Sequence, residues 1–446
     1  MIGLDGADHT LMTALVKAGR LPNIERLLQF SIARRVELPI GASDDSQWAE
    51  FQYASDLGHH GRYFWKRATD SDGRFTFCDD EERELPAFWE HINTDRGRVA
   101  IFDLPKCRPT EHINGLHLTD WSVQGRYGDR VRSWPPGLAD EVLTHFGAEP
   151  DHFTAVDGHQ LKPGMDQQFR DALLQSSEAK AAAALHWLQS DSWSLFATAF
   201  KEIHTASHAL WPTSTAHPSQ AERDADSLQA IFARVDHGIG QLIRSAGSDA
   251  SVVLFSPSGF SESGTLDHFG DAIAQALNEQ LTRQLVPHQD WFVRLTSSIS
   301  TFFPRRELVS IPLVRRVPHT ERVLAFRLRE SSPEILTKIK DDLTSLIDPS
   351  TGRRVFATVT TPRSSHTGPR ANDLPDVVAV VSIGVNPTRL RSPRLGDFAA
   401  EPGPVSAGFH AKQGFAISPP DFDEYLPTGL ARMQDLGRAA VRYLRT

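Results

Sequence analysis

Short apolar segments recur along the chain and are separated by stretches with helical periodicity. The clearest apolar segments are residues 1–4, 99–105, 193–200 and 251–255, and the clearest intervening helices are residues 178–188 and 220–245. Apolar strands that alternate with helices are typical of a mostly parallel sheet with helices on both faces. The pattern therefore predicts a doubly wound α/β fold.

The composition is that of an ordinary globular protein, with 40% hydrophobic and 23% charged residues among 446. The net charge of -9 argues against a protein that binds nucleic-acid polymers, although it leaves room for a small anionic substrate. No apolar run reaches the roughly 18 residues of a membrane span, and no secretory leader is evident. We therefore expect a cytoplasmic protein with no membrane partner; its oligomeric state is left open.

The chain has two cysteines, Cys78 and Cys107. Two thiols can form neither a disulfide framework nor a thiolate zinc cluster. Any metal site must therefore be built from histidines and carboxylates.

Asp5 ends the first apolar segment and lies between Gly3 and Gly6. The carboxyl ends of strands open onto the ligand crevice of α/β sheets, and glycines allow the sharp turn that such a site needs. Asp5 is thus a candidate metal ligand, with helix capping as the equally weighted alternative. The strand before it is short for the middle of a sheet, which leaves open whether Met1 is the native start.

Several short motifs together resemble one known family. They are residues 2–8 with residues 19–23, Trp48 followed by His60 and Gly61, Gly368 and Pro369 with residues 374–376, and residues 408–410 with Gly414. In order and spacing they resemble the type I phosphodiesterase/nucleotide pyrophosphatase branch of the alkaline phosphatase superfamily. The resemblance runs from end to end, and the chain departs from the family at the metal and nucleophile positions.

The resemblance implies an alkaline-phosphatase-like α/β/α sandwich around a central, mostly parallel sheet, with inserted cap regions. We expect residues 1–446 to form a single such domain, with cap insertions at about 110–175 and 260–320. A helix at 332–347 between strands at 322–328 and 355–360 predicts a smaller β-α-β lobe at about 320–385.

Family members hold two divalent metals, usually zinc, which activate a Thr or Ser nucleophile and clamp the phosphoryl oxygens. One metal is held by an Asp and a His spaced i, i+4 and by a late His, and this chain has His204, His208 and His410 at those positions. Imidazole replaces the carboxylate at position 204 without loss of ligating ability. The alternative is that His204 and His208 lie on the polar side of a solvated helix.

The second family site is altered. Asp5 is retained, but Pro257 and Ser258 stand where an Asp and a His are expected, so we expect this site to be empty. Asp44 occupies the position of the family's nucleophile. It is a candidate for one of three roles: covalent nucleophile, general base or metal ligand. Ser43 and Ser46 are alternative nucleophiles, and helix capping is the alternative role for Asp44.

The remaining candidates are weaker. His60, Ser256 and Ser258 are placed as substrate-binding residues by their positions in the nucleophile and degraded metal loops. We expect Lys106 and Arg108 to be solvated surface charges, with binding of an anionic group as their alternative role. Glu202 is expected to be an exposed helix glutamate, with orientation of His204 as its alternative role.

Three functions are consistent with these residues. The first is a hydrolase of a small phosphoester, phosphodiester or sulfate ester. It would use one divalent metal, preferably zinc, bound by His204, His208 and His410. Asp5 would be a fourth ligand or a general base, and Asp44 is the other candidate for the general base. The second is a redox metalloenzyme with iron or copper at the same histidines. The third is an inactive relative that binds a ligand.

Overall fold

The computed structural model of the chain describes the following residues: 1–68, 74–78, 85–92, 97–121, 131–157, 160–213, 218–262, 264, 266–285, 312–318, 322–382, 385–399, 407–410, 413–429 and 431–445. Two compact units account for them. The first contains residues 1–65, 78–263 and 404–446, and the second contains residues 66–77 and 264–403.

The first unit is built on a nine-stranded sheet with the order β21-β2-β20-β11-β1-β10-β5-β6-β7. Its strands are β1 (Ile2–Leu4), β2 (Ile32–Glu37), β5 (Val99–Phe102), β6 (Gly115–Thr119), β7 (Arg132–Trp134), β10 (Leu195–Phe200), β11 (Leu254–Ser256), β20 (Gln413–Ser418) and β21 (Ala431–Arg432). The run β11-β1-β10-β5-β6 is parallel throughout, whereas β20 and β7 pair antiparallel with their neighbours. The predicted mostly parallel α/β sheet is confirmed.

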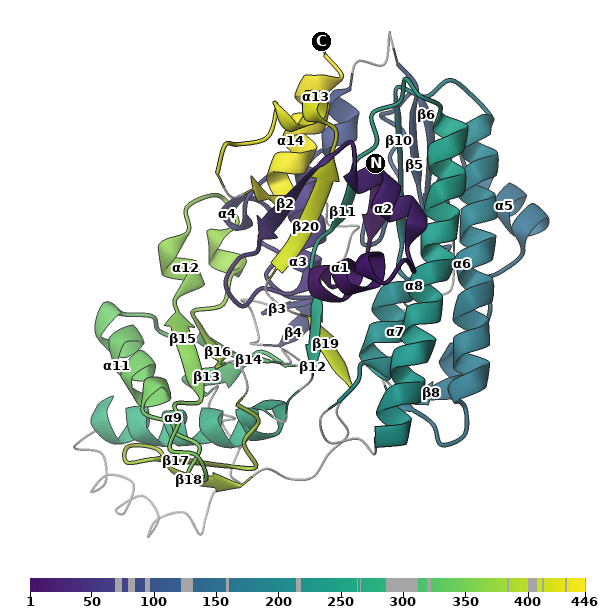
Figure 1. Cartoon of the computed structure of the whole chain (residues 1–446). Helices are drawn as coiled ribbons and strands as arrows, with labels where there is room; N and C mark the ends of the chain where they lie inside the picture. Colours follow the sequence, from purple (N-terminus) through teal and green to yellow (C-terminus); the bar gives the residue numbers. More distant parts are fainter. Residues whose placement is uncertain are drawn as a thin grey trace, which may run out of the picture. The chain divides into compact units, whose positions relative to one another are not determined.

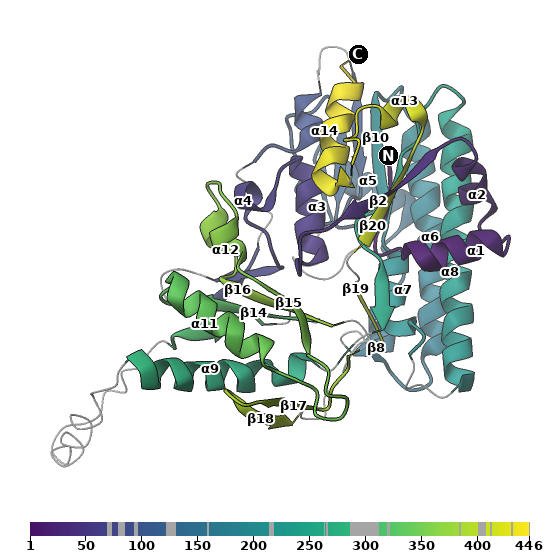
Figure 2. The same cartoon turned by 60° about the vertical axis from the view of Figure 1, so that its left-hand side comes forward.

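Helices cover both faces of this sheet (Figures 1 and 2). One face packs against α1 (His9–Lys17), α2 (Pro22–Leu28), α5 (Leu138–Phe146), α6 (Asp166–Gln189), α7 (Glu202–Leu210) and α8 (Pro218–Ala246). The other packs against α3 (Asp44–Tyr53), α13 (Pro420–Asp423) and α14 (Met433–Tyr443). The central strands are apolar on both sides because both sides are covered.

Four parallel strands end at the same edge of the sheet. Asp5 follows β1, Asp103 follows β5, α7 begins directly after β10, and Ser258 follows β11. The antiparallel strand β20 begins at this edge, so β19 (Gly408–His410), which precedes it, lies there too. The topology therefore gathers residues from five distant parts of the sequence into one crevice.

The second unit has its own core around a four-stranded sheet with the order β13-β14-β16-β15. Its elements are β13 (Val314–Arg316), β14 (Val323–Leu328), β15 (Phe356–Thr360), β16 (Val377–Val381), α9 (Gly270–Leu285), α11 (Pro333–Thr344), the hairpin β17 (Arg389–Ser392) and β18 (Gly396–Ala399), and the hairpin β3 (Lys66–Ala68) and β4 (Phe75–Phe77). Strands β14 and β15 both pair antiparallel with β16, which lies between them.

The predicted internal boundaries stay predictions. Strands β6 and β7, which fall within the predicted cap at 110–175, belong to the nine-stranded sheet. Of the second predicted cap, at 260–320, residues 286–311 lie outside the described part of the chain.

One buried carboxylate ties two distant helices of the first unit together. Asp236 of α8 accepts hydrogen bonds from the backbone N–H of Asn23 at 3.2 Å and of Ile24 at 2.8 Å, and from the side chain of Asn23 at 2.8 Å. Leu21, the N-cap of α2, provides no side-chain cap of its own. Asp236 therefore caps α2 from across the fold.

Replacing Asp236 with Ala should lower the free energy of unfolding by about 2–3 kcal/mol, because buried N–H donors at the start of α2 lose their acceptor. Urea unfolding followed by circular dichroism measures the change. The control is Asp226→Ala, an exposed carboxylate of the same helix. Equal stability of the two variants would show that Asp236 is not the cap that holds α2.

Candidate metal centre

Helix α7 carries the first two histidines of the centre. Because α7 starts directly after β10, its first turn lies at the crevice. His204 and His208 are one helical turn apart, so both side chains leave the same face of α7, and both are buried. The alternative, in which His204 and His208 lie on the polar side of a solvated helix, is therefore wrong.

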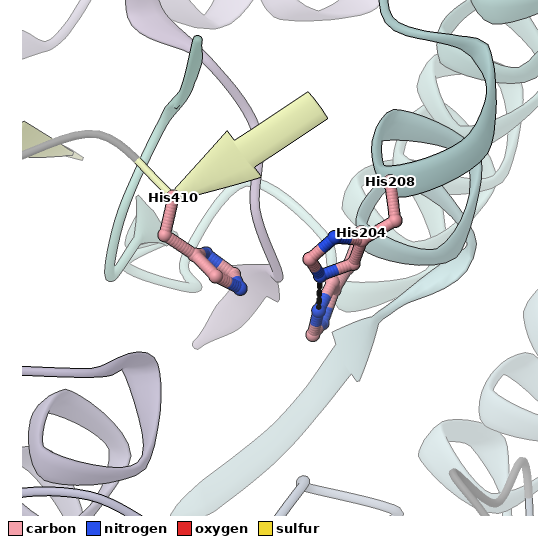
Figure 3. A group of neighbouring side chains, drawn as sticks. All are labelled: His204, His208 and His410. Atoms are coloured by element: carbon pink, nitrogen blue, oxygen red, sulfur yellow. Dashed lines mark hydrogen bonds between the residues drawn. The ribbon is translucent and has the colours of Figure 1, made fainter. Parts of the chain in front are cut away.

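The third histidine comes from the short strand β19, which pairs with β12 (Phe260–Glu262) so that His410 lies opposite Phe260. The His410 ring centroid is 4.8 Å from that of His204 and 5.1 Å from that of His208. One ring nitrogen of each histidine lies within 4.8 Å of the others. Figure 3 shows the three imidazoles converging from α7 and β19.

Hydrogen bonds to the Nδ1 atoms determine which ring nitrogens face one another. His204 Nδ1 is 2.7 Å from Asp5 Oδ2, and His208 Nδ1 is 3.2 Å from the carbonyl oxygen of Gly408. A carboxylate and a carbonyl can only accept, so both histidines donate through Nδ1–H. His410 Nδ1 is 3.0 Å from Ser258 Oγ, a hydroxyl that can accept or donate, so His410 presents an Nε2 lone pair when its Nδ1–H donates to Ser258.

The Nε2 atoms of His204 and His208 face each other at 2.9 Å (Figure 3). With each ring neutral and protonated at Nδ1, both Nε2 atoms present lone pairs, which repel unless a cation or a shared proton lies between them. Such an arrangement, with outer hydrogen bonds that fix the tautomer and Nε2 atoms that converge, is the usual construction of a histidine metal site. The donor set therefore fits a divalent transition metal such as zinc.

The electrostatic environment keeps His410 neutral. Burial lowers the pKa of His410 to about 4; the negative charge of Asp44 opposes this and His204 reinforces it. A metal ligand must be unprotonated, so at neutral pH this imidazole is ready to bind.

Asp5 lies between Trp48 and His204. Its Oδ1 accepts a hydrogen bond from Trp48 Nε1 at 2.9 Å, and its Oδ2 accepts from His204 Nδ1. Burial alone would raise the pKa of Asp5. The positive charge that His204 carries when both of its ring nitrogens are protonated, its hydrogen bond, and the charge of Lys106 bring the pKa of Asp5 below its ordinary value. With one oxygen on Trp48 and the other on His204, Asp5 has the contacts of a carboxylate that orients a ligand.

Two glycines permit the close approaches that build the centre. Gly6 has a φ of +68°, and a Cβ there would lie 2.6 Å from the Phe260 ring and 3.1 Å from the Cα of His204. A Cβ on Gly408 would lie 2.1 Å from the carbonyl oxygen of Ser207. Gly408 therefore reaches α7 closely enough for its carbonyl to hold His208.

Lys106 is a site residue that the sequence analysis assigned to the surface. Its side chain is 4% exposed and forms an ion pair with Asp44 Oδ2, and its Nζ lies 3.6 Å from Asp45 Oδ2. Arg108 is exposed as expected. The signal that could have identified Lys106 is its place just after the end of β5, at the edge of the sheet where Asp5 also lies.

Asp44 connects this ion pair to the histidines. It is the first residue of α3, is buried, and has its Oδ2 3.9 Å from His410 Nε2. Asp5, Asp44 and His204 form a second group whose ligand atoms lie within 4.8 Å of one another. The structure thus brings the predicted residues Asp5, Asp44 and the three histidines together.

The serines of the predicted site make different contacts. Ser43 Oγ is within 3.5 Å of Asp45 Oδ2 and 3.3 Å of the Tyr63 carbonyl oxygen. Ser256 accepts from the backbone N–H of Ala7 and donates to the Ser258 carbonyl, so it joins the turns after β1 and β11. Ser258 contacts His410. Their roles in catalysis and substrate binding stay predictions.

His60, the last residue of α4 (Leu57–His60), is buried, and its Nδ1 accepts a hydrogen bond from the backbone N–H of Arg62. Its role in substrate binding also stays a prediction. The neighbouring His59 has a half-exposed side chain and pairs with Asp56 on the surface.

Beneath α7 lies a buried ionic network that sequence reasoning missed. Lys180 Nζ lies 2.5 Å from Asp103 Oδ2, and Glu202 Oε1 accepts from Ser176 Oγ at 2.9 Å. Burial lowers the pKa of Lys180 and raises that of Glu202, each opposed by the nearby charges. The expectation that Glu202 is exposed is wrong, because the first turn of α7 is covered by α6.

Replacing Asp5 with Asn should lower zinc affinity by about 10- to 100-fold, because the amide cannot accept from His204 Nδ1–H with the strength of a carboxylate. Competition with a chromogenic chelator measures the affinity. Asp56→Asn, a surface carboxylate bound to an exposed histidine, is the control. Unchanged affinity in the Asp5 variant would show that this carboxylate does not support the centre.

Comparison with solved structures shows which known proteins share this fold. The chain is similar in structure to phosphonoacetate hydrolase from Sinorhizobium meliloti 1021 in complex with phosphonoacetate, with a TM-score of 0.60 at 12% identity, covering 99% of this chain and 94% of that one. It is also similar to an inactive murine ectonucleotide pyrophosphatase/phosphodiesterase 5 in complex with AMP, with a TM-score of 0.52 at 10% identity, covering 100% and 94%. The fold is that of the alkaline phosphatase superfamily.

The family model for type I phosphodiesterase/nucleotide pyrophosphatase matches residues 1–410. The chain therefore belongs to this family, and the resemblance inferred from its motifs is confirmed. No curated protein sequence matches the chain. Within the described residues, no helix combines the length and apolarity needed to cross a membrane.

Proposed function

We propose that this chain is a hydrolase that acts on a small anionic phosphoester, phosphodiester or sulfate ester through one divalent metal ion held by His204, His208 and His410. The observation that carries the proposal is that one ring nitrogen of each of the three histidines lies within 4.8 Å of the others, while the Nδ1 atoms contact Asp5, Gly408 and Ser258. Family membership and the names of the similar structures support the substrate class.

Zinc is the metal that this donor set favours, because three neutral imidazoles with an open fourth position are a common catalytic zinc site. When bound, the ion would act as a Lewis acid toward an anionic oxygen of the substrate. Iron or copper at the same nitrogens would support the redox alternative.

Within this proposal, Asp44 takes the proton from the attacking water. Its carboxylate lies beside His410 and is held by Lys106, so it is fixed at the edge of the centre. Asp5, whose oxygens contact Trp48 and His204, orients the metal ligand. Ser43 is the alternative nucleophile, since it precedes Asp44 at the start of α3.

The inactive-relative alternative has one observation in its favour. Asp44, at the nucleophile position, is engaged in an ion pair, and a carboxylate held in this way is a weaker base than an unpaired one. A water molecule activated by Asp44 would therefore be deprotonated less readily than one activated by an unpaired carboxylate.

Metal analysis of the purified full-length protein tests the centre. We expect about one zinc per chain in the wild type and close to none in His208→Ala and His410→Ala, because two imidazoles hold zinc far more weakly than three. The control is His59→Ala, which removes a half-exposed histidine from the surface. Full metal content in either of the first two variants would rule out the three-histidine centre.

A panel of nitrophenyl phosphate, bis-nitrophenyl phosphate and nitrophenyl sulfate tests the reaction. We expect turnover of at least one ester by the zinc-loaded protein and a fall in kcat of about 10²- to 10⁴-fold in Asp44→Asn, the usual range for loss of a general base. Asp45→Asn, a change at the adjacent residue of α3, is the comparison. Turnover of none of the esters by a chain with full metal content would favour the redox or inactive alternative.

A further inference from the structure

The Lys106 ammonium lies among buried carboxylates. It enters from the loop after β5, its side chain is 4% exposed, and it pairs with Asp44 and lies 3.6 Å from Asp45 Oδ2. A lysine buried to this degree is uncommon unless its charge is balanced. The position of this ammonium is therefore determined by the carboxylates around it.

The charges of the crevice show what Lys106 balances. Asp5, Asp44 and Asp45 are all buried. Asp5 has Trp48 and His204 as hydrogen-bonding partners, whereas Asp44 forms an ion pair with the Lys106 ammonium, which also lies 3.6 Å from Asp45 Oδ2. Buried carboxylates that lose their counter-ion are strongly destabilised, so a cation is required beside α3.

The backbone at Lys106 adds an independent observation. Its φ of +59° lies in the left-handed region, which a residue with a long side chain adopts at a cost of about 1 kcal/mol or more. Such a conformation persists only where the surrounding contacts impose it. The contacts observed at Lys106 are those of its ammonium with Asp44 and Asp45.

A divalent cation could meet the same need. Asp5, Asp44 and His204 bring three ligand atoms within 4.8 Å of one another. His204 belongs to the three-histidine centre, so a second cation would depend on the carboxylates of this group, which suit hard cations such as Mn²⁺. The ammonium of Lys106 is in contact with Asp44, a member of that group. A metal ion and the ammonium would compete for the same carboxylate, that of Asp44.

We propose that the Lys106 ammonium serves as a built-in cation in place of a second metal ion, so that the chain binds one divalent ion instead of two. Lys106 is thus a positioning residue, which holds Asp44 at the edge of the three-histidine centre. This proposal rests on the proposed function in one respect: it assumes that the first metal ion binds the three histidines.

The test is the difference in Mn²⁺ binding between Lys106→Ala and the wild type, measured by equilibrium dialysis of zinc-loaded, full-length protein. We expect about one additional Mn²⁺ per chain in Lys106→Ala, because removal of the ammonium exposes the carboxylate group to a cation. Lys106→Arg, which keeps the charge, and Arg108→Ala, which removes an exposed charge from the same loop, should bind no more than the wild type. The additional ion should disappear in Lys106→Ala/Asp44→Asn.

Equal Mn²⁺ binding by Lys106→Ala and the wild type would overturn the proposal. A wild type that binds no zinc would instead contradict the three-histidine centre, so the two failures are distinguishable. If Lys106→Ala does not fold, the pair Lys106→Met and Lys106→Met/Asp44→Asn replaces it. The proposal then requires the melting temperature to fall in Lys106→Met and to recover in Lys106→Met/Asp44→Asn, in which neither charge remains. A double variant that does not recover would overturn the proposal.

Discussion

The hydrogen bond between Asp5 and His204 is the contact on which the arrangement of the crevice depends. It joins the end of β1 to the first turn of α7 across 199 residues of sequence. By accepting a hydrogen bond from His204 Nδ1–H, Asp5 directs the opposite nitrogen toward His208, and Trp48 holds Asp5 from the other side. Without this contact the imidazole could rotate, and the other two histidines would have no common point to face.

The crevice also shows how a family site can be rebuilt while its charges stay balanced. In this chain an aspartate lies at the start of α3 and a proline and a serine follow β11, where the family is expected to have a nucleophile and two ligands. The ion pair of Lys106 with Asp44 and that of Lys180 with Asp103 place two ammonium groups in the buried region around α7. Because an unpaired buried charge is costly, each substitution of this kind constrains its neighbours.

The sequence was sufficient for the fold class and for the family, because both depend on patterns of local order. Apolar segments such as residues 193–200 predict strands, and the spacing of His204 and His208 predicts a shared helix face. The exposure of Lys106 and Glu202 was wrongly predicted, since an isolated charged residue in a loop or at the start of a helix is usually solvated. Burial of those residues depends on helices and loops that are distant in sequence.

The sequence by itself thus determined which residue types are available: histidines in place of a mixed ligand set, and no thiolate cluster. Only the tertiary structure decided how they are used. Parallel strands that end at one edge bring Asp5, Lys106 and His204 together, and β19 adds His410. The protonated nitrogen of His204 and that of His208 follow from the acceptor that packs against each ring, and that acceptor comes from another part of the chain. Hydrogen bonds and ion pairs depend on the positions of their atoms to within a few tenths of an ångström. The order of residues along a chain does not specify atomic positions so closely.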